Sequence, residues 1–308
     1  MSTPKVSIII LNWNGWQDTL ECLDSLAKID YPNYEIIVVD NGSTDESAEK
    51  IKIWINTHKS VISYKLLVNS YNAGFAGGNN VGIKYALKNG ADYVLLLNND
   101  TLVEPNFLSE LVKIGESDKK IGLIGSKIYF YPPIGAPRVW FAGGKINWLK
   151  TRGSHLNYSQ TDKEYEALKV TDYLTGCCLL IKREVIEKIG GLSDDYFLYY
   201  EDTDYCLQAR EAGWQCALAP ESHIWHKISR STKEFSPSYL YYHARNGLMM
   251  AKRANGGAKI FLVYIFSAYL AAKQIVKYLF CPAKRQWARM ILLGIYDFWR
   301  NKAGKMAS

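Results

Sequence analysis

Four apolar runs of strand length occur in the first hundred residues. They are rich in β-branched side chains and read KVSIIIL (5–11), EIIVVD (35–40), SYKLLV (63–68) and DYVLLL (92–97). The segments between them place apolar residues at helical spacing, as Leu20, Leu23 and Ala27 do. Apolar strands that alternate with helices predict an α/β fold, in which a mostly parallel sheet is flanked by helices.

Three of these predicted strands end in polar residues. Asn12 and Asn14 follow the first strand, Asp40 and Asn41 end the second, and Asn98-Asn99-Asp100 ends the fourth. Ligands of parallel sheets bind beyond the carboxyl ends of the strands. A single polar ending is explained by a turn or a helix cap, but three together indicate a shared crevice.

Asp100 is a candidate ligand for a hard divalent cation such as Mg²⁺ or Mn²⁺, which prefers oxygen ligands. Asn98 and Asn99 bring amide groups suited to ribose hydroxyls or phosphate. One carboxylate is a weak metal site, so a second ligand is needed, and His226 is a candidate for it. His223 competes for this role, and a structural role for either histidine remains an alternative.

A second acidic cluster, Glu201, Asp202 and Asp204, lies at the predicted start of a helix. Acids are favoured there by the helix dipole, which explains them without any catalysis. Alternatively, one of them faces the crevice and acts as a general base towards a sugar hydroxyl. Residues 72–80 (NAGFAGGNN) predict a glycine-rich loop before a helix, but they match neither GxGxxG nor GxxxxGK[ST]. Between residues 129 and 170 we expect loops and short hairpins.

Eight blocks resemble family 2 inverting glycosyltransferases, and among these the bacterial rhamnosyltransferases of surface polysaccharides. In order, they are SIIILNWNG, IIVVDNGSTD, NAGFAGGNN, LLLNNDT, TGCCLLIKRE, LYYEDTDYCLQAREAGW, PESHIWHKIS and YYHARNGLMM. The resemblance covers roughly residues 5–255. It implies a GT-A (Rossmann-like) fold, a dTDP- or UDP-sugar donor, a divalent cation, and transfer of one sugar, L-rhamnose from dTDP-rhamnose, to a glycan or lipid-linked acceptor.

The resemblance also implies roles for individual residues. Asp202 falls at the position of the catalytic base, and Asp100 and His226 at positions of metal ligands. Asn98 stands where the family's DxD motif has its first Asp, which removes one negative charge near the cation. The remaining residues implied at the donor site are Leu11, Asn12, Asp40, Asn72, Gly77, Asn80, Asn98 and Asn99.

Positive charge is concentrated at the C-terminal end. Residues 243–308 contain twelve Lys or Arg and one acid, a net +11, whereas residues 1–242 contain 25 basic and 29 acidic residues, a net −4. The charge pattern predicts a body in 1–242, and the resemblance implies that this body is a catalytic domain with nucleotide-sugar binding in 1–128 and the acceptor half in 129–242. A basic helical region then follows in 243–308.

Residues 258–305 mix basic and aromatic side chains, which favours peripheral contact with an anionic membrane. The stretch from Ile260 to Ala272, which ends before Lys273, is too short to span a bilayer. The alternative is packing against the catalytic domain or another subunit. No nucleic-acid motif accompanies the charge. The N-terminus has no signal-peptide pattern and no CxxC pair occurs, so we expect a cytoplasmic protein at the inner face of the membrane.

Two other functions fit part of the pattern. A sugar-nucleotide pyrophosphorylase shares the fold class and the cation, but a glycine-rich signature is expected where this chain has LNWNG. A non-catalytic glycan-binding protein on the same scaffold is the other alternative, against which the retained Asp100, Asp202 and His226 argue. A processive synthase is disfavoured because there is no QxxRW motif.

Overall fold

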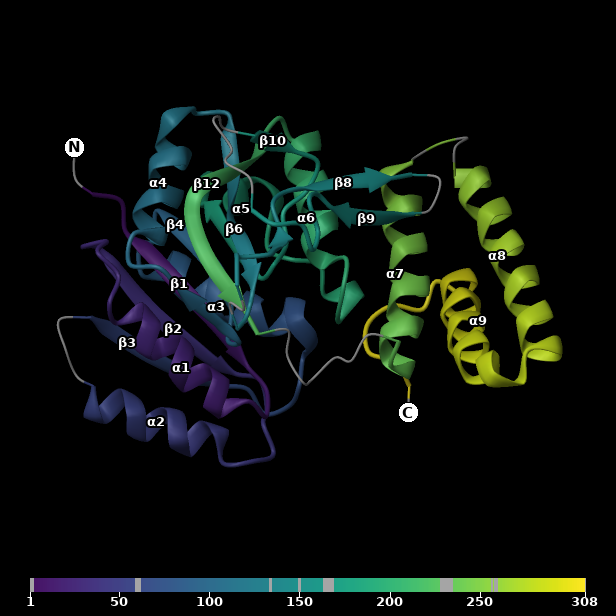
Figure 1. The fold of residues 1–308 in the computed structure, drawn as a ribbon, viewed down its shortest axis with the longest axis horizontal. Coiled ribbons are helices and arrows are strands. Elements are labelled where there is room, and N and C mark those ends of the chain that lie inside the picture. The colour runs from purple at the N-terminus through teal and green to yellow at the C-terminus, as the bar shows by residue number, and fades with distance from the viewer. Residues whose placement is uncertain are drawn as a thin grey trace.

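The computed structural model describes residues 3–58, 62–132, 135–148, 151–162, 169–227, 235–255, 257 and 260–307. An α/β domain with a large twisted sheet occupies one side of the molecule, and three long helices, α7 to α9, occupy the other (Figure 1). The predicted fold class is therefore confirmed: a mostly parallel sheet with flanking helices is followed by a helical C-terminal region.

The N-terminal half builds a parallel sheet in the order β3-β2-β1-β4. Its strands are β1 (Val6–Asn12), β2 (Tyr34–Asp40), β3 (Ser63–Val68) and β4 (Tyr93–Asn98). The chain moves outward from β1 to β3 and then crosses back to place β4 on the other side of β1. This reversal creates a switch point between β1 and β4, where parallel sheets bind ligands. The polar endings of β1 and β4 both lie there.

The second half extends the same sheet with strands of both directions. Next to β4 lies β11 (Cys178–Lys182), which is antiparallel to β4 and to β6 (Ile121–Phe130). The long strand β12 (Gln215–His226) runs parallel to β6. The shorter strands that complete this half are β5 (Thr101–Val103), β7 (Val139–Phe141) and β10 (Lys169–Thr171). Because β11 is antiparallel to β4, its first residues lie against the last residues of β4.

Six helices belong to this domain: α1 (Trp16–Leu26), α2 (Ser47–Thr57), α3 (Gly74–Lys88), α4 (Phe107–Ser117), α5 (Arg183–Ile189) and α6 (Glu201–Glu211). Right-handed crossovers place α1 and α2 on one face of the sheet and α3 on the other. The residues of β1, β2 and β4 are nearly all buried, as a sheet covered on both faces requires.

The glycine-rich segment 72–80 is not a loop throughout, because α3 begins at Gly74. One of its glycines serves close packing instead: a Cβ on Gly78 would lie 2.4 Å from Leu11 Cδ1. Gly82, one turn further along α3, packs in the same way, because a Cβ there would lie 2.7 Å from Ile9 Cγ2. The second and third turns of α3 thus rest directly on β1. The expected hairpin region contains β8 (Gly144–Asn147) paired with β9 (Arg152–His155). All six cysteines are unbridged, and only Cys281 is exposed.

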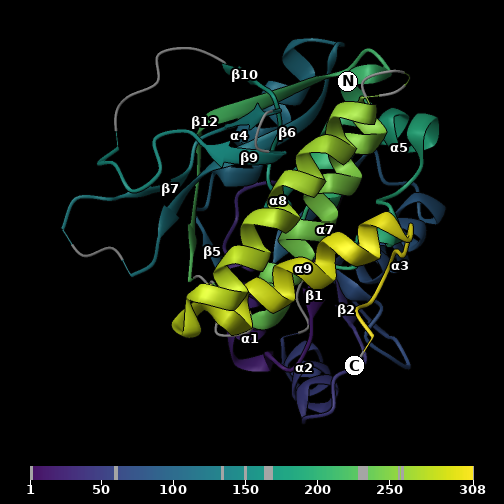
Figure 2. The same ribbon diagram turned by 90° about the vertical axis from the view of Figure 1, so that its right-hand side faces the viewer.

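The C-terminal helices are α7 (Pro237–Ala254), α8 (Ile260–Phe280) and α9 (Arg285–Trp299). Figure 2 shows α8 and α9 as the outer layer over α7. The boundary expected between residues 242 and 243 falls inside α7, so the domain and the extension share a continuous helix. A second apolar cluster joins the three helices through Leu248, Ala251, Val263, Ala271, Ile295 and Phe298.

The helix that contains the apolar segment is longer than the lysine-free stretch from Ile260 to Ala272. α8 has 21 residues, including Lys273 and Lys277, and by length and composition it is the one helix of the described residues apolar enough to cross a bilayer. At 1.5 Å per residue it is roughly 30 Å long.

Replacement of Gly82 by alanine tests the close approach of α3 to β1. Alanine favours helix over glycine by about 1 kcal/mol, but its Cβ would meet the fully buried Ile9 side chain. We expect a net loss of about 1–3 kcal/mol in the free energy of unfolding, measured by urea denaturation. Lys84→Ala, at an exposed position of α3, is the control and should change stability by less than about 0.5 kcal/mol. A stabilised Gly82→Ala variant would contradict the packing.

Candidate active site

A chain of buried hydrogen bonds joins the polar strand ends. Asn12 donates its amide to Asp40 Oδ1 at 2.7 Å, and Ser43 Oγ donates to the same oxygen at 2.6 Å. Thr19 Oγ1 donates to Asn12 Oδ1 and accepts from Asn99 Nδ2. These contacts fix the ends of β1, β2 and β4 relative to one another. Ser43, in the turn after β2, thus holds the Asp40 carboxylate.

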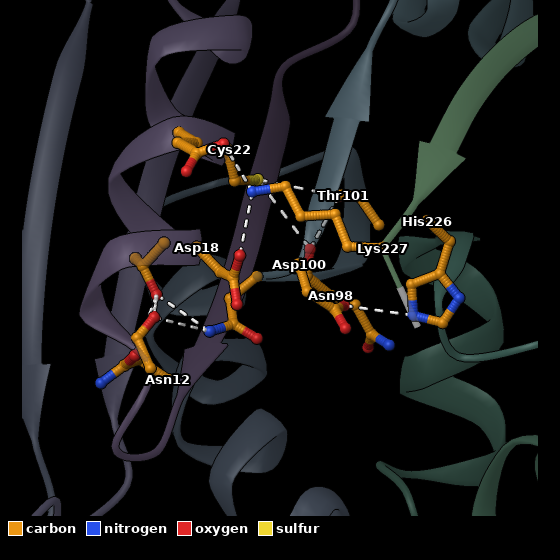
Figure 3. Close-up of polar contacts among 12 residues, drawn as sticks. Asn12, Asp18, Cys22, Asn98, Asp100, Thr101, His226 and Lys227 are labelled. Atoms are coloured by element: carbon orange, nitrogen blue, oxygen red, sulfur yellow. Dashed lines mark hydrogen bonds and ion pairs between the residues drawn. The ribbon is translucent and has the colours of Figure 1, made fainter. Parts of the chain in front are cut away.

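Asp100 and His226 meet at the end of β4, where Asp100 Oδ1 lies 3.2 Å from His226 Nε2 (Figure 3). Asp100 is 3% exposed and His226 7%. His226 is the last residue of β12, and its ring packs edge-on against Trp140 with centroids 4.5 Å apart. The other ring nitrogen, Nδ1, is buried without a hydrogen-bond partner.

The structure separates the two candidate histidines. Residues three apart in a strand point to opposite faces, and His223 accordingly turns away from Asp100. Its Nδ1 lies 3.1 Å from a carboxylate oxygen of Glu104, and its Nε2 lies 2.9 Å from the carbonyl of Pro220.

Lys227 extends the site beside Asp100. Its backbone N–H donates to the Asp100 carbonyl, and its ammonium lies between Asp18 and Glu21 at 2.9 and 2.6 Å (Figure 3). Burial lowers the pKa of Lys227, but the hydrogen bonds to Glu21 and Asp18 outweigh burial and raise it. The positive charge beside the candidate metal ligands is therefore paired with two carboxylates.

The residues expected along the donor loop shape the start of α3. Asn72 Oδ1 accepts from the N–H of Gly74 and from Asn41 Nδ2. Gly77 lies one helical turn further on. The Asn80 side chain hydrogen bonds to the segment after α5. Its Oδ1 accepts from the N–H of Leu192, and its Nδ2 donates to the Leu192 carbonyl and to Asp194. Asn80 thus holds a neighbouring loop in this structure.

Asp202 is brought to the same rim through the turn before β11. Its Oδ2 accepts from the N–H of Gly176 at 2.8 Å, and the carbonyl of the next residue, Cys177, accepts from Asn98 N–H at 3.0 Å. Two adjacent residues therefore contact both the Asp202 side chain and the end of β4. Burial raises the pKa of Cys177 well above its usual value, and the nearby charges of Asp100 and Asp202 raise it further.

The neighbouring acid, Glu201, has a different environment. It is 5% exposed and its Oε2 has no hydrogen-bond partner. Burial, followed by the charge of Asp202, raises the pKa of Glu201 well above its usual value. Glu201 is therefore a buried residue of the core, whereas Asp202 is partly exposed and accepts hydrogen bonds from Gly176 and Thr203. Of the two acids, Asp202 is the one available to a substrate.

The backbone that leads to Asp202 is strained. Phe197, Tyr199 and Tyr200 have φ values of 60°, 67° and 75°, although none is glycine. Such conformations cost about 1–3 kcal/mol each and persist only where the surroundings enforce them. The segment is gripped on one side by α3, where Phe75 N–H donates to the Phe197 carbonyl at 2.7 Å.

The β8–β9 hairpin also reaches this rim, which the sequence did not indicate. His155 hydrogen bonds to the Trp140 carbonyl, and its ring lies 4.9 Å from that of Trp140. Burial lowers the pKa of His155, Asp202 opposes this effect, and His226 adds to it. His155 therefore lies near both Asp202 and His226. The loosely patterned region carried no motif that pointed to such a role.

Comparison with known proteins agrees with this arrangement. The family model for glycosyl transferase family 2 matches residues 7–190, more than half of the chain. The hexosyltransferase Agl10 of low-salt glycan biosynthesis in Haloferax volcanii is 25% identical over 97% of this chain and 92% of its own length. The N-acetylglucosaminyl-diphospho-decaprenol L-rhamnosyltransferase of Mycobacterium tuberculosis is 24% identical over 82% of this chain and 86% of its own length. By contrast, the chain spans only 25% of protein y4gI of Sinorhizobium fredii, to which it is 30% identical over 74% of its residues.

Among solved structures, the mannosyltransferase PcManGT of Pyrobaculum calidifontis, in complex with GDP-Man and Mn²⁺, superposes with a TM-score of 0.63. The match covers 98% of this chain and 89% of that one at 16% identity, so it supports the fold alone. The sheet with its switch point between β1 and β4 is the GT-A fold. The chain belongs to glycosyl transferase family 2.

Proposed function

We propose that the protein transfers one sugar, L-rhamnose from dTDP-rhamnose, to a glycan or lipid-linked acceptor with inversion at the anomeric carbon. The observation that carries this proposal is the shared rim: residues 176 and 177 hold Asp202 on one side and the end of β4, with Asp100, on the other. The name of the M. tuberculosis relative supports rhamnose as the sugar and a lipid-linked sugar as the acceptor.

The donor is expected along the carboxyl ends of β1, β2 and β4. Asp40, with Leu11 and Asn12, would bind the nucleobase. The start of α3 with Asn72 and Gly77, together with Asn98 and Asn99, would line the ribose and diphosphate. Asn80 would act indirectly, because its amide is engaged by residues 192–194.

The site fits a divalent cation. Asp100 and His226 offer a carboxylate oxygen and an imidazole nitrogen 3.2 Å apart, and one divalent cation can take both ligand types. No third His, Cys, Asp or Glu converges on them among the residues that the structure describes, so oxygens of the donor diphosphate would complete the shell. A bound Mg²⁺ or Mn²⁺ supplies charge stabilisation to the leaving diphosphate.

Asp202 is the proposed general base. Gly176 and Thr203 hold its carboxylate at the rim, so that it accepts the proton of the acceptor hydroxyl as that oxygen attacks the anomeric carbon. Inversion follows because attack comes from the face opposite the leaving group.

The C-terminal helices are the proposed membrane contact, at the cytoplasmic face. Apart from a narrow buried stripe, α8 presents large apolar side chains to solvent, with Phe261 69%, Leu262 62% and Phe280 75% exposed. Lys273 and Lys277 lie among them. Amphipathic helices with basic residues bind anionic bilayers by this combination of apolar burial and charge.

Asp202→Asn tests the general base. The amide keeps the shape of the side chain but does not take up a proton, so turnover should fall at least about a hundredfold while donor affinity changes little. Transfer from dTDP-rhamnose and calorimetric donor binding would be measured on the same sample. Glu211→Gln, at the exposed C-terminal end of α6, is the control. Near-normal turnover of Asp202→Asn would remove Asp202 from this role.

Asp100→Ala tests the cation site. It removes the carboxylate but no contact to the nucleobase, so the gain in donor affinity on adding Mn²⁺ should shrink by about tenfold or more. Titration calorimetry of dTDP-rhamnose with and without Mn²⁺ measures this gain. Asp118→Ala, at an exposed position after α4, is the control. An unchanged Mn²⁺ effect in Asp100→Ala would contradict the assignment.

Charge reversal on α8 tests the membrane contact. The double variant Lys273→Glu, Lys277→Glu should lose co-sedimentation with phosphatidylserine vesicles, because each lysine near the surface contributes about 1 kcal/mol. Lys84→Glu, Lys88→Glu on α3 has the same spacing and charge change and should bind like the parent protein. If the parent protein does not sediment with the vesicles at low salt, the membrane proposal fails.

A further inference from the structure

The strained segment before Asp202 is held by α7 through its backbone carbonyls. The side-chain amide of Asn246 lies 2.9, 2.8 and 2.9 Å from the carbonyl oxygens of Tyr196, Leu198 and Tyr199. Asn246 is fully buried. One amide nitrogen thus contacts three of the four carbonyls between residues 196 and 199, where the chain takes up its left-handed conformations.

Arg245 contacts the same segment from the preceding position. Its Nη2 lies 3.4 Å from the Asp195 carbonyl and 3.3 Å from that of Tyr196, and its Nε donates to Asn246 Oδ1 at 2.9 Å. The guanidinium therefore orients the Asn246 amide as well as binding carbonyls. Gly247 lets α7 come close to its neighbours, because a Cβ there would lie 2.7 Å from the Thr151 carbonyl oxygen and 3.1 Å from the Tyr200 hydroxyl.

Arg245 is fully buried, and in the part of the chain that the structure describes no carboxylate forms an ion pair with it. Its charge is met by carbonyl dipoles, the Tyr241 hydroxyl at 3.2 Å, and the rings of Tyr241 and Tyr242, each 5.2 Å away. Burying a cation in this way is costly, and an apolar residue would fill a purely structural position more cheaply.

The contacts continue into the end of the chain. The Tyr241 hydroxyl donates to Asp297 of α9 at 2.6 Å, and the N–H of Gly304 donates to the Asp195 carbonyl at 2.7 Å. A Cβ on Gly294 would lie 2.6 Å from the Tyr241 carbonyl, so α9 packs directly on α7. The chain after α9 therefore contacts the same segment, residues 195–200, that α7 holds.

We propose that Arg245 and Asn246 are positioning residues, which hold residues 195–200, with left-handed backbone at positions 197, 199 and 200, and thereby fix Asp202 at the rim. The helical extension is then an integral part of the active site and not a detachable appendage. This inference rests on the proposed role of Asp202. It assigns Arg245 and Asn246 no contact with substrate, since their polar groups are turned to the protein backbone.

Asn246→Ala is the test, with Asn255→Ala as the matched control, since Asn255 lies at the end of α7 and its side-chain amide donates to the Ala251 carbonyl. Hydrogen–deuterium exchange of peptides covering residues 193–204 should accelerate about tenfold in Asn246→Ala. Turnover should fall about ten- to a hundredfold, with donor affinity in calorimetry unchanged. Arg245→Lys keeps the positive charge but loses the guanidinium donors, so it should show smaller changes in exchange and turnover in the same direction. If Asn246→Ala does not fold, Arg245→Lys is the test.

Unchanged exchange in residues 193–204 would overturn the proposal, as would faster exchange with normal turnover. A loss of donor affinity equal to the loss of turnover would also overturn it, because the defect would then not be confined to the base. A different result would show that the proposed function is wrong: Asp202→Asn would transfer sugar at the parental rate. The hydrogen–deuterium exchange of residues 193–204 would still report whether α7 holds the segment.

Discussion

The antiparallel insertion of β11 beside β4 is the constraint on which the site depends. In a purely parallel sheet, the turn before β11 would lie at the opposite edge from the end of β4. Antiparallel pairing of Cys178 with Leu97 instead sets the start of β11 against the end of β4. The turn at Gly176 and Cys177 then bonds Asp202 with one residue and Asn98 with the next. Two acids a hundred residues apart in sequence come to one rim through this register.

Polar groups at this rim are bound mainly to one another. Asn12, Thr19, Ser43 and Asn99 form hydrogen bonds that hold the strand ends and the Asp40 carboxylate in place. Such a network is costly to bury unless it is satisfied, and when satisfied it makes the surface rigid. A donor that binds here meets side chains already oriented, so little further ordering is required of the protein on binding.

The parts of this architecture that follow from local pattern were predictable from sequence. Alternating apolar strands and helices indicated the sheet, and polar residues after β1, β2 and β4 indicated its binding edge. The choice between His223 and His226 required the register of β12, which local pattern does not reveal. The same holds for segment 72–80: glycines suggested a loop, but the need of α3 to pack against Leu11 and Ile9 explains them as small residues in a helix. Arg245 and Asn246 lie in the block YYHARNGLMM, but the carbonyls that they contact are about fifty residues away in sequence. These contacts can be seen only in the folded chain.

Charge distribution indicated a separate basic region, but α9 both packs against α7 and faces solvent. α9 turns Ile295, Asp297 and Phe298 towards α7 and leaves Trp287, Tyr296 and Trp299 partly exposed. One helix therefore serves both the proposed membrane surface and the support of the Asp202 segment. A chain that ended after α7 would expose Leu248 and Ala251, which are fully buried against the outer helices. Loss of activity in such a truncated chain would not distinguish a missing membrane contact from a displaced base, whereas charge reversal on α8 leaves the packing of α7 intact and separates the two effects.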